Sequence, residues 1–462
     1  MSTTPPESLA FRPRLGRHLK DLTRLAVPMI LARSGQTIMI TVDTMMVGRY
    51  SAGDLAYLGL ANAVLFTVMI GAIGLLIGTV ASTSRAYGAG DADLCGEVFR
   101  RGVRYAFVLG VAAMVLMAWP EPLFSLTAGS ADMVAGAASA TRIFALGLPG
   151  ATLFMMAAFF LEGIKRPRPA MVLMVGANLL NILLNWLLVY GHWGLPALGA
   201  DGSALASSIL RWAMAGALLA YILWLMPGRS AFALRRPRPG SWRRATRERR
   251  LGYANGVSQL AEAAAFSAMT LYASAISVIA VGVYTISLNL LGMLFMVALG
   301  TGFATAVRVG YAIGHGDGDE TAFAGWTGLA ANTVVCLLLA ALVVTPFAGA
   351  IASFYTEDPA LIAAATPLLI LTAFAVIFDG GQGVMATTLR AMHDTWMPTL
   401  CHVVSYIVIM LPLGWLLAIT LERGTRGLIE AIIIASIVSV GLLSARFFVL
   451  SRRPPEVLAG DV

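Results

Sequence analysis

Charged residues are scarce in this chain of 462 residues. Asp, Glu, Lys and Arg make up 12% of it, about half of their share in soluble globular domains, whereas hydrophobic residues make up 58%. This composition excludes a soluble enzyme fold. The apolar residues form blocks of about 20, which is the length that an α-helix needs to cross a bilayer, and not the alternating segments of about ten residues that build a membrane β-barrel. The sequence therefore predicts an all-α integral membrane protein.

Cysteine, lysine and histidine are also rare, and their positions exclude several chemistries. The three cysteines, Cys95, Cys336 and Cys401, have no metal-like spacing and predict neither a disulfide framework nor a zinc site. The two lysines, Lys20 and Lys165, follow Leu and Ile, so the glycine-rich loop of an ATP-driven pump is absent. No H-E-x-x-H or G-x-S-x-G motif is present. We expect no catalytic activity, no ATP and no cofactor beyond a coupling ion.

The apolar runs, separated by charged breaks, predict twelve spanning helices. They cover residues 25–47, 57–83, 105–119, 140–161, 169–190, 202–226, 251–277, 283–306, 325–348, 360–388, 398–420 and 427–449. The stretch from Ala263 to Ala306 carries no charge and is long enough for two spans. We place its turn between Ser277 and Gly282, where small residues permit one.

Basic residues are distributed unequally between the two sides of these spans. With twelve spans both termini share a side, and 26 of the 32 Lys and Arg residues fall in the termini and connections of that side. An excess of basic residues in connecting loops marks the cytoplasmic side of a membrane. We therefore predict cytoplasmic termini. The net charge of +8 then reflects topology, and no nucleic-acid partner is expected.

The two halves of the chain match at an offset of 226 residues. The pattern Gly-x-Gly-Asp-x-Asp occurs from Gly88 to Asp93, after the second span, and from Gly314 to Asp319, after the eighth. Chance matching of Gly-rich and Ala-rich helices is the alternative to a duplication. Because each half has an even number of spans, both halves enter from the same side, and a pseudo-two-fold axis along the membrane normal relates them. The predicted parts are a cytoplasmic N-terminal segment (1–24), an N-lobe of helices one to six (25–226), a basic linker (227–250), a C-lobe of helices seven to twelve (251–449) and a cytoplasmic tail (450–462).

Five charged residues are predicted inside spans, where each charge costs at least about 2.5–3.5 kcal/mol and marks a functional candidate. They are Arg33, Asp43, Arg211, Glu262 and Asp379. The alternative for each acid is permanent neutralisation by Arg33 or Arg211, or a position nearer a loop than predicted. The roles of the two arginines stay open. Glu162 and Glu430 lie at span ends, where we expect them to be solvated.

Amide side chains accompany the acid of the first half. Gln36 precedes Asp43 by two helical turns on one face, and Asn178, Asn181 and Asn185 share one face of the fifth span. Amides beside a buried carboxylate can stabilise its ionised form or complete an oxygen shell for Na⁺, whereas burial alone favours a bound proton. We predict a cation or proton site here.

The second half carries its own set of acids and amides. Asn255 precedes Glu262 by two turns in the seventh span, and Gln382 follows Asp379 by about one turn in the tenth. These four residues are a second candidate site.

Several motifs resemble those of the multidrug and toxic compound extrusion (MATE) transporters. They are Pro28, Gln36-Thr37, Val42-Asp43-Thr44-Met45-Met46-Val47-Gly48, Asn181-x-x-x-Asn185-Trp186, Leu198-Gly199-Ala200-Asp201-Gly202 and Arg308-Val309-Gly310-Tyr311. The resemblance covers nearly the whole chain. Glu262 and Asp379 match the pair of acids that is typical of the bacterial NorM-like branch.

The resemblance implies two six-helix bundles around a central cavity and antiport of organic cations against Na⁺ or H⁺. Asp43 with Asn181 and Asn185 would form the N-lobe site, and Glu262 with Asp379 the C-lobe site, so that either set is a possible Na⁺ site. Asn289 of the eighth span matches an Asn of the family. The chain departs from the pattern at Ala375, where an aromatic hydroxyl is usual, and at Tyr284, where a His is usual. Loss of that hydroxyl weakens the case for Na⁺.

We therefore expect a monomeric multidrug exporter of the bacterial inner membrane. Its partners would be small organic, mostly cationic amphiphiles and the lipid bilayer, and it would work by alternating access. One alternative is a flippase for a lipid-linked oligosaccharide, which would need several arginines in its cavity for pyrophosphate. The other is a membrane-embedded enzyme or channel.

Overall fold

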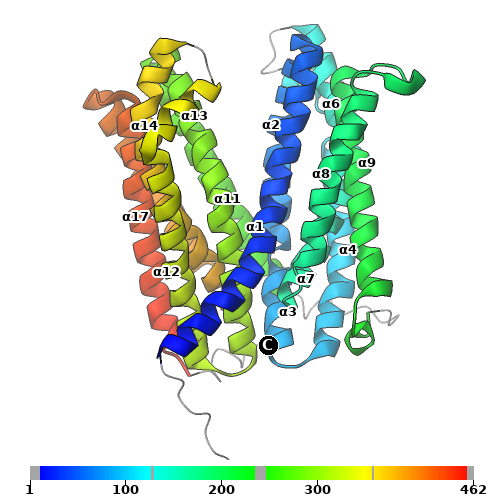
Figure 1. The fold of residues 1–462 in the computed structure, drawn as a ribbon, viewed down its shortest axis with the longest axis vertical. Helices are drawn as coiled ribbons and strands as arrows, with labels where there is room; N and C mark the ends of the chain where they lie inside the picture. The colour runs from blue at the N-terminus through cyan, green and yellow to red at the C-terminus, as the bar shows by residue number, and fades with distance from the viewer. Residues whose placement is uncertain (1–10, 126–129, 235–245, 356–357, 455–462) are drawn as a thin grey trace, which may run out of the picture.

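Two helical bundles lie side by side in the computed structural model (Figure 1). The structure describes residues 11–125, 130–234, 246–355 and 358–454, and within these ranges it contains helices and no strand. Residues 11–234 form the N-lobe, drawn in blue to green, and residues 246–454 form the C-lobe, drawn in yellow-green to red. The first helix crosses from the lower end of the C-lobe into the N-lobe. The predicted fold class is confirmed.

The N-lobe contains nine α-helices and three short helical turns in its described part. They are α1 (Phe11–Tyr50), α2 (Ala52–Leu76), α3 (Gly78–Gly88), α4 (Ala92–Leu116), α5 (Glu121–Phe124), α6 (Ala131–Leu146), α7 (Leu148–Gly163), α8 (Arg168–Leu188), η1 (His192–Gly194), α9 (Gly199–Ala220), η2 (Tyr221–Leu225) and η3 (Arg229–Phe232).

The C-lobe repeats this pattern of long helices. Its described elements are α10 (Thr246–Ile276), α11 (Val278–Gly314), α12 (Gly318–Leu342), η4 (Val343–Phe347), α13 (Ala348–Tyr355), α14 (Pro359–Ala391), α15 (Met397–His402), η5 (Val403–Met410), α16 (Leu411–Trp415), η6 (Leu416–Thr420) and α17 (Gly424–Ser451).

Within the described ranges, nine helical stretches are long and apolar enough to cross a membrane, and the pair α6 and α7, bent by 44°, makes ten. The two other long helices, α4 and α10, carry charged residues near their first turns. Both coincide with predicted spans, and the count of twelve stays a prediction. The helices extend beyond the predicted spans, since α1 begins 14 residues before residue 25. The turn inside the uncharged stretch lies at Ser277, whose side chain caps α11.

The duplicated Gly-x-Gly-Asp-x-Asp pattern forms the same turn in both lobes. Gly90 and Gly316 have positive φ angles of 74° and 78°, a conformation that glycine adopts without steric cost. Asp91 and Asp317 then cap the next helix, each accepting a hydrogen bond from a backbone N–H three residues on at 2.8 Å. The repeated motif therefore has a structural role: it forms a turn and caps the helix that follows. Much of the predicted linker, including residues 235–245, lies outside the described residues.

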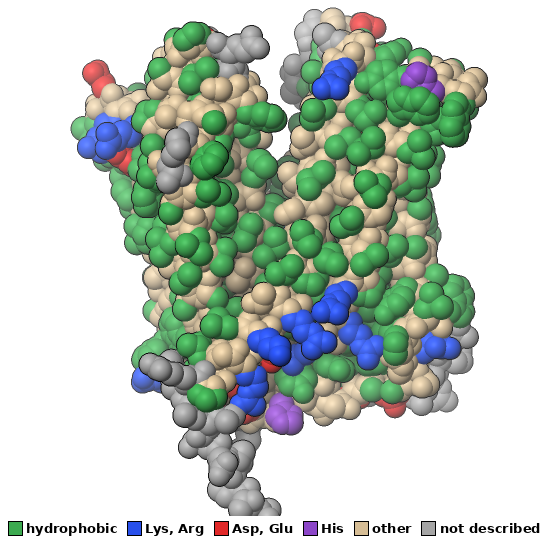
Figure 2. All heavy atoms as spheres, in the orientation of Figure 1, with side chains coloured by type: hydrophobic (Ala, Val, Ile, Leu, Met, Phe, Trp, Pro, Cys, Tyr) green, Lys and Arg blue, Asp and Glu red, His purple; other side chains and the backbone are tan. Residues whose placement is uncertain are grey.

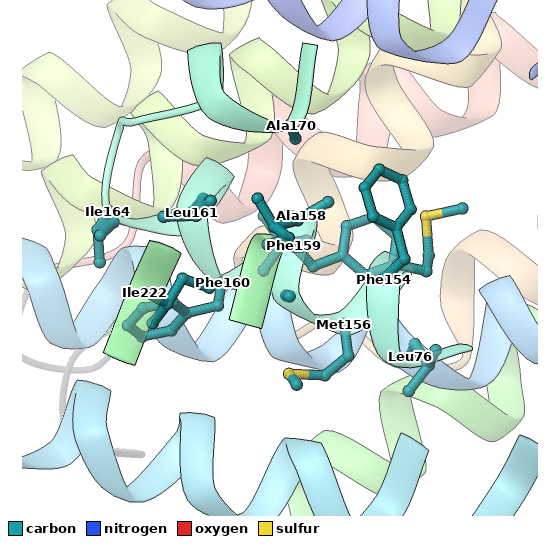
Figure 3. Close-up of a cluster of buried hydrophobic side chains, with 14 of the residues drawn as sticks. Leu76, Phe154, Met156, Ala158, Phe159, Phe160, Leu161, Ile164, Ala170 and Ile222 are labelled. Carbon is teal, nitrogen blue, oxygen red and sulfur yellow. The ribbon is translucent and has the colours of Figure 1, made fainter. Parts of the chain in front are cut away.

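Helix α7 forms the centre of the N-lobe, because all 16 of its residues are buried. Figure 3 shows Phe159 and Phe160 of this helix among side chains of neighbouring elements, including Leu76 of α2, Ala170 of α8 and Ile222 of η2. The same apolar cluster includes residues of α11, so that it continues into the C-lobe.

The lobes touch at one end and separate at the other. Most Lys and Arg side chains of the visible face gather at the lower end in Figure 2, where α1 begins and α17 ends in Figure 1. We call this the basic end. Figure 2 shows a hollow between the lobes at the opposite end.

Glycines permit the contact between the lobes at the basic end. A Cβ atom at Gly88 of α3 would lie 2.1 Å from the backbone oxygen of Tyr311, and one at Gly314 of α11 would lie 2.0 Å from that of Arg85. Only glycine fits at such distances. The backbones of α3 and α11 therefore pack directly against each other.

Candidate functional site

Asp43 of α1 accepts hydrogen bonds through both of its carboxylate oxygens. Its Oδ1 accepts from Nδ2 of Asn181 at 2.9 Å and from Nδ2 of Asn185 at 2.7 Å, and its Oδ2 accepts from the Ser207 hydroxyl at 2.9 Å. All four side chains are buried. Three donors on the carboxylate offset the cost of removing its charge from water. We call these four residues the N-lobe site.

Three helices position the N-lobe site. Asn181 and Asn185 lie one turn apart on the face of α8 that packs against α1, and Nδ2 of Asn185 also donates to the backbone oxygen of Asn181 at 3.0 Å. Ser207 comes from α9. This helix approaches α8 closely because it has Gly202, where a Cβ would lie 2.4 Å from the backbone oxygen of Leu188.

The other amides predicted near Asp43 lie elsewhere. Asn178 donates to the backbone oxygen of Gly35 at 3.1 Å and to that of Met174 at 2.9 Å, so it joins α8 to α1 one to two turns away from the acid. Gln36 is partly buried and makes no hydrogen bond to the described residues. The structure therefore brings two of the four predicted amides to Asp43.

Arg211 of α9 follows Ser207 by one turn and interacts electrostatically with Asp43. Its guanidinium lies 5.4 Å from the ring centroid of Phe144 and 3.5 Å from the backbone oxygen of that residue. A positive charge thus stands beside the N-lobe site without a direct ion pair to the acid.

Asp379 of α14 accepts hydrogen bonds through one oxygen. The donors to Oδ1 are the Tyr406 hydroxyl at 3.0 Å, the Ser436 hydroxyl at 3.3 Å and Nε2 of Gln382 at 3.4 Å. They come from η5, α17 and α14, and all are buried. Among the described residues no hydrogen bond reaches Oδ2. These four residues and Glu262 form the C-lobe site.

Glu262 of α10 is partly buried and makes no hydrogen bond to the described residues, but it interacts electrostatically with Asp379 and with Arg390. Arg390 is held in place by a hydrogen bond to the Ser258 hydroxyl at 3.1 Å. The two acids of the C-lobe therefore repel each other, and Arg390 offsets part of the negative charge of Glu262.

Two other predicted residues of the second half lie apart from the acids. Nδ2 of Asn255 reaches the backbone oxygen of Gly74 at 3.4 Å, which places it between α10 and α2 at the contact of the lobes. Asn289 of α11 is exposed and donates to the backbone oxygen of Thr285 at 2.9 Å. Neither side chain contacts Asp379 or Glu262 through a hydrogen bond.

The expectation that Glu162 is solvated is wrong. Its side chain is 2% exposed and pairs with Arg33 at 3.4 Å. The Arg33 guanidinium also lies 5.0 Å from the ring centroid of Phe159 and 4.4 Å from that of Phe303. Arg33 is thus neutralised by Glu162 and not by an acid of either site, and its contact with Phe303 crosses from the N-lobe to the C-lobe.

Sequence comparison identifies the family. The sequence profile of the family described as MatE matches residues 28–187 and 255–416, one match in each lobe. The chain belongs to the MatE family. The probable multidrug resistance protein NorM of Caulobacter vibrioides is 38% identical over 94% of this chain and 92% of its own length. The multidrug resistance protein PmpM of Pseudomonas aeruginosa is 30% identical over 95% of this chain and 93% of its own. The resemblance of the sequence motifs to this family is confirmed.

Solved structures of the MatE family share the fold. The eukaryotic MATE transporter AtDTX14 superposes with a TM-score of 0.85 over 96% of this chain and 98% of its own, at 19% identity. An outward-facing multidrug resistance MATE transporter superposes with a TM-score of 0.84 over 98% of this chain and 99% of its own, at 21% identity. These structures show the fold, and the sequence relatives above place the chain among membrane transporters of the MatE family.

The sequence analysis did not identify three hydroxyl groups that donate hydrogen bonds to the buried acids, those of Ser207, Tyr406 and Ser436. Each is a single hydroxyl in an apolar helix other than the helix of its acid, so no spacing along the chain relates it to Asp43 or Asp379. Tyr406 supplies the aromatic hydroxyl that Ala375 lacks. The one signal for Ser207 is its position one turn before Arg211, the charged residue of the same span.

Proposed function

We propose that this MatE transporter is a secondary exporter that exchanges organic, mostly cationic amphiphiles for H⁺ or Na⁺ by alternating access. The observation that carries the proposal is a buried carboxylate site in each lobe. A proton or Na⁺ at a buried carboxylate cancels its charge, lowers its affinity for a cationic compound and changes the relative stability of the two cavity conformations. Ion and compound thus compete.

The basic end is the cytoplasmic end in this proposal, in line with the bias of basic residues towards cytoplasmic loops. The hollow of Figure 2 then opens away from the cytoplasm. The protein acts as a monomer in the bacterial inner membrane.

The proton is the first candidate for the coupling ion. Na⁺ collects several hard oxygen ligands, whereas a proton needs one desolvated carboxylate. Among the described residues no group of three or more Asp, Glu, His or Cys side chains is arranged to hold a metal ion. Tyr406 and Gln382 supply oxygen atoms near Asp379, although Ala375 lacks the usual hydroxyl. The Oε1 of Gln382 has no hydrogen-bond partner among the described residues. Na⁺ therefore stays as the second candidate.

The flippase alternative requires arginines that are free to bind pyrophosphate. Arg33 is paired with Glu162, and Arg211 stands beside Asp43. Both arginines are thus engaged in the N-lobe, which disfavours this alternative.

The test is efflux of a fluorescent organic cation from proteoliposomes of the purified protein, with each gradient imposed alone. We expect a pH gradient without Na⁺ to drive transport, and Glu262→Gln and Asp379→Asn to abolish the response. Glu430→Gln removes an acid that pairs with Arg423 and Arg426 outside both sites, and it should leave transport unchanged. Transport driven by a Na⁺ gradient at equal pH, with an uncoupler present, would show that the coupling ion is Na⁺ and not H⁺. Transport with neither gradient would contradict secondary antiport.

A further inference from the structure

One exposed face of α1 changes from basic to apolar along the helix. Arg17, Lys20 and Arg24 lie three and four residues apart, and Val27 and Leu31 continue the same face at 46% exposure each. Among the described residues, the three basic side chains form neither a hydrogen bond nor an ion pair. They are three unpaired cations directly below an exposed apolar surface.

The neighbouring helix α8 has a face of the same kind. Arg168, its first residue, is exposed and unpaired within the described part of the chain. Val172, Val175 and Leu179 follow on that face with exposed fractions of 61%, 50% and 69%. The face ends at Trp186, which is 37% exposed.

The two faces adjoin each other. Helices α1 and α8 are in contact where Asn178 donates to the backbone oxygen of Gly35, and both run upward from the basic end in Figure 1. Figure 2 shows a band of Lys and Arg side chains over the lower part of α1 and the start of α8, with hydrophobic side chains above it. An apolar surface and a group of cations therefore lie one above the other along both helices.

The length of α8 indicates where this band lies relative to the lipid bilayer. Trp186 is the eighteenth residue after Arg168, which corresponds to about 27 Å of helix, close to the hydrocarbon thickness of about 30 Å. Tryptophan is enriched at the membrane–water interface. With Trp186 at one interface, Arg168 lies at the other, at the level of the lipid phosphates.

Two acids lie near this band, and within the described part of the chain neither forms an ion pair with Lys20, Arg24 or Arg168. Asp21 interacts electrostatically with Lys165 and Arg308, and Glu320 pairs with Arg14 and His18.

Lys165 itself is engaged, since its amine lies 3.1 Å from the ring centroid of Tyr311. Burial and the neighbouring Arg308 lower the pKa of Lys165 to about 8. Lys165 is therefore a weaker anion ligand than the exposed cations of the band.

We propose that Lys20, Arg24 and Arg168 form a binding site for the phosphate headgroup of an anionic phospholipid, whose acyl chains lie on the apolar faces of α1 and α8. The excess of cytoplasmic basic residues explains the sign of these charges. It does not explain why they stand unpaired directly below exposed apolar faces on two adjoining helices. Binding at this site does not depend on the exporter proposal.

The position of the site predicts an effect on the lobes. Helix α1 packs against α8 of the N-lobe and contacts the C-lobe through Arg14, which pairs with Glu320 of α12, and through Arg33, which lies over Phe303 of α11. A lipid on α1 therefore binds to the helix that joins the lobes. We expect the rate of transport to rise with the fraction of anionic lipid.

The test is native mass spectrometry of the whole protein with added phosphatidylglycerol or phosphatidylethanolamine. The variant Lys20→Gln, Arg24→Gln and Arg168→Gln is compared with the control variant Arg229→Gln, Arg452→Gln and Arg453→Gln, which removes three exposed cations elsewhere at the basic end. Each cation near a lipid surface contributes about 1 kcal/mol, or about a five-fold change in affinity. We expect the first variant to bind phosphatidylglycerol about 100-fold more weakly and the control to match the parent.

Two results would overturn the site. One is equal loss of phosphatidylglycerol binding in both variants, which would mean that net charge alone attracts the lipid. The other is displacement of the lipid by inorganic phosphate at equal concentration, which would indicate a general anion site. The monodispersity of each variant on a sizing column checks that it is folded.

Discussion

The two lobes bury their acids in different ways. Both oxygens of Asp43 accept hydrogen bonds, from donors at 2.7 to 2.9 Å, and Arg211 stands nearby. Asp379 accepts at 3.0 to 3.4 Å through Oδ1 alone, with a second acid, Glu262, coupled to it. The N-lobe thus holds one firmly fixed carboxylate, and the C-lobe holds a loosely fixed pair.

This difference indicates a division of tasks between the sites. A proton or cation can approach Oδ2 of Asp379 without breaking a hydrogen bond to a described residue, and two adjacent carboxylates share a positive ion readily. At Asp43, Oδ1 accepts two hydrogen bonds and Oδ2 accepts one, so a new ligand finds a single open acceptor position on Oδ2. We infer that the C-lobe pair binds the coupling ion more readily than Asp43 does.

The largest expected effect belongs to Asp43→Asn, which keeps the shape of the side chain but removes its charge. Efflux should fall to background, because the N-lobe site then has no charge for the compound or the ion to neutralise. Drug resistance of cells that produce the variant measures this, with its amount in the membrane determined by immunoblotting. Retained resistance would make Asp43 a structural residue and remove the proposed division of tasks.

Tyr406→Phe tests the C-lobe site, because it deletes the shortest hydrogen bond to Asp379. A hydrogen bond to a charged group contributes about 1.5–3 kcal/mol, so ion-driven efflux should fall about ten-fold or more. The matched control is Tyr284→Phe in the same lobe, since the buried Tyr284 hydroxyl has no hydrogen-bond partner in the described structure. Equal rates for the two variants would show that the hydroxyl of Tyr406 is not part of the site.

The smallest effect is expected for Ser207→Ala, which removes the single donor to Oδ2 of Asp43. Because Asn181 and Asn185 still hold Oδ1, efflux should fall only a few-fold. Ser203→Ala is the control on the same helix, as the buried Ser203 hydroxyl has no partner among the described residues. A complete loss with Ser207→Ala alone would show that Oδ2, and not Oδ1, carries the function of the N-lobe site.

Much of the architecture follows from the sequence because lipid imposes simple rules on it. Blocks of about 20 apolar residues marked the spans, and the small residues near Ser277 marked the turn between α10 and α11. Helix periodicity also predicts that Asn181 and Asn185 share one face of their helix, whereas their pairing with Asp43 is what the resemblance to the MATE family implies.

Contacts between helices were harder to predict, because they depend on how the helices rotate and cross. Glu162 lies near a span end in the sequence, yet packing against α1 buries it beside Arg33. The three hydroxyl donors of the two sites come from helices distant in sequence. Asn178 has the spacing of a site residue but lies below Asp43, where it meets the backbone of α1.

The glycine contact between α3 and α11 has a mechanical consequence. Gly88 is the last residue of α3, a helix of 11 residues, whereas Gly314 is the last residue of α11, which has 37 residues and is about 55 Å long. A rotation of one lobe about a contact at the end of such a helix would move its far end further than the residues beside the contact. Because neither glycine has a side chain, the two backbones meet directly here, while side-chain contacts such as that of Phe159 with Phe303 also join the lobes.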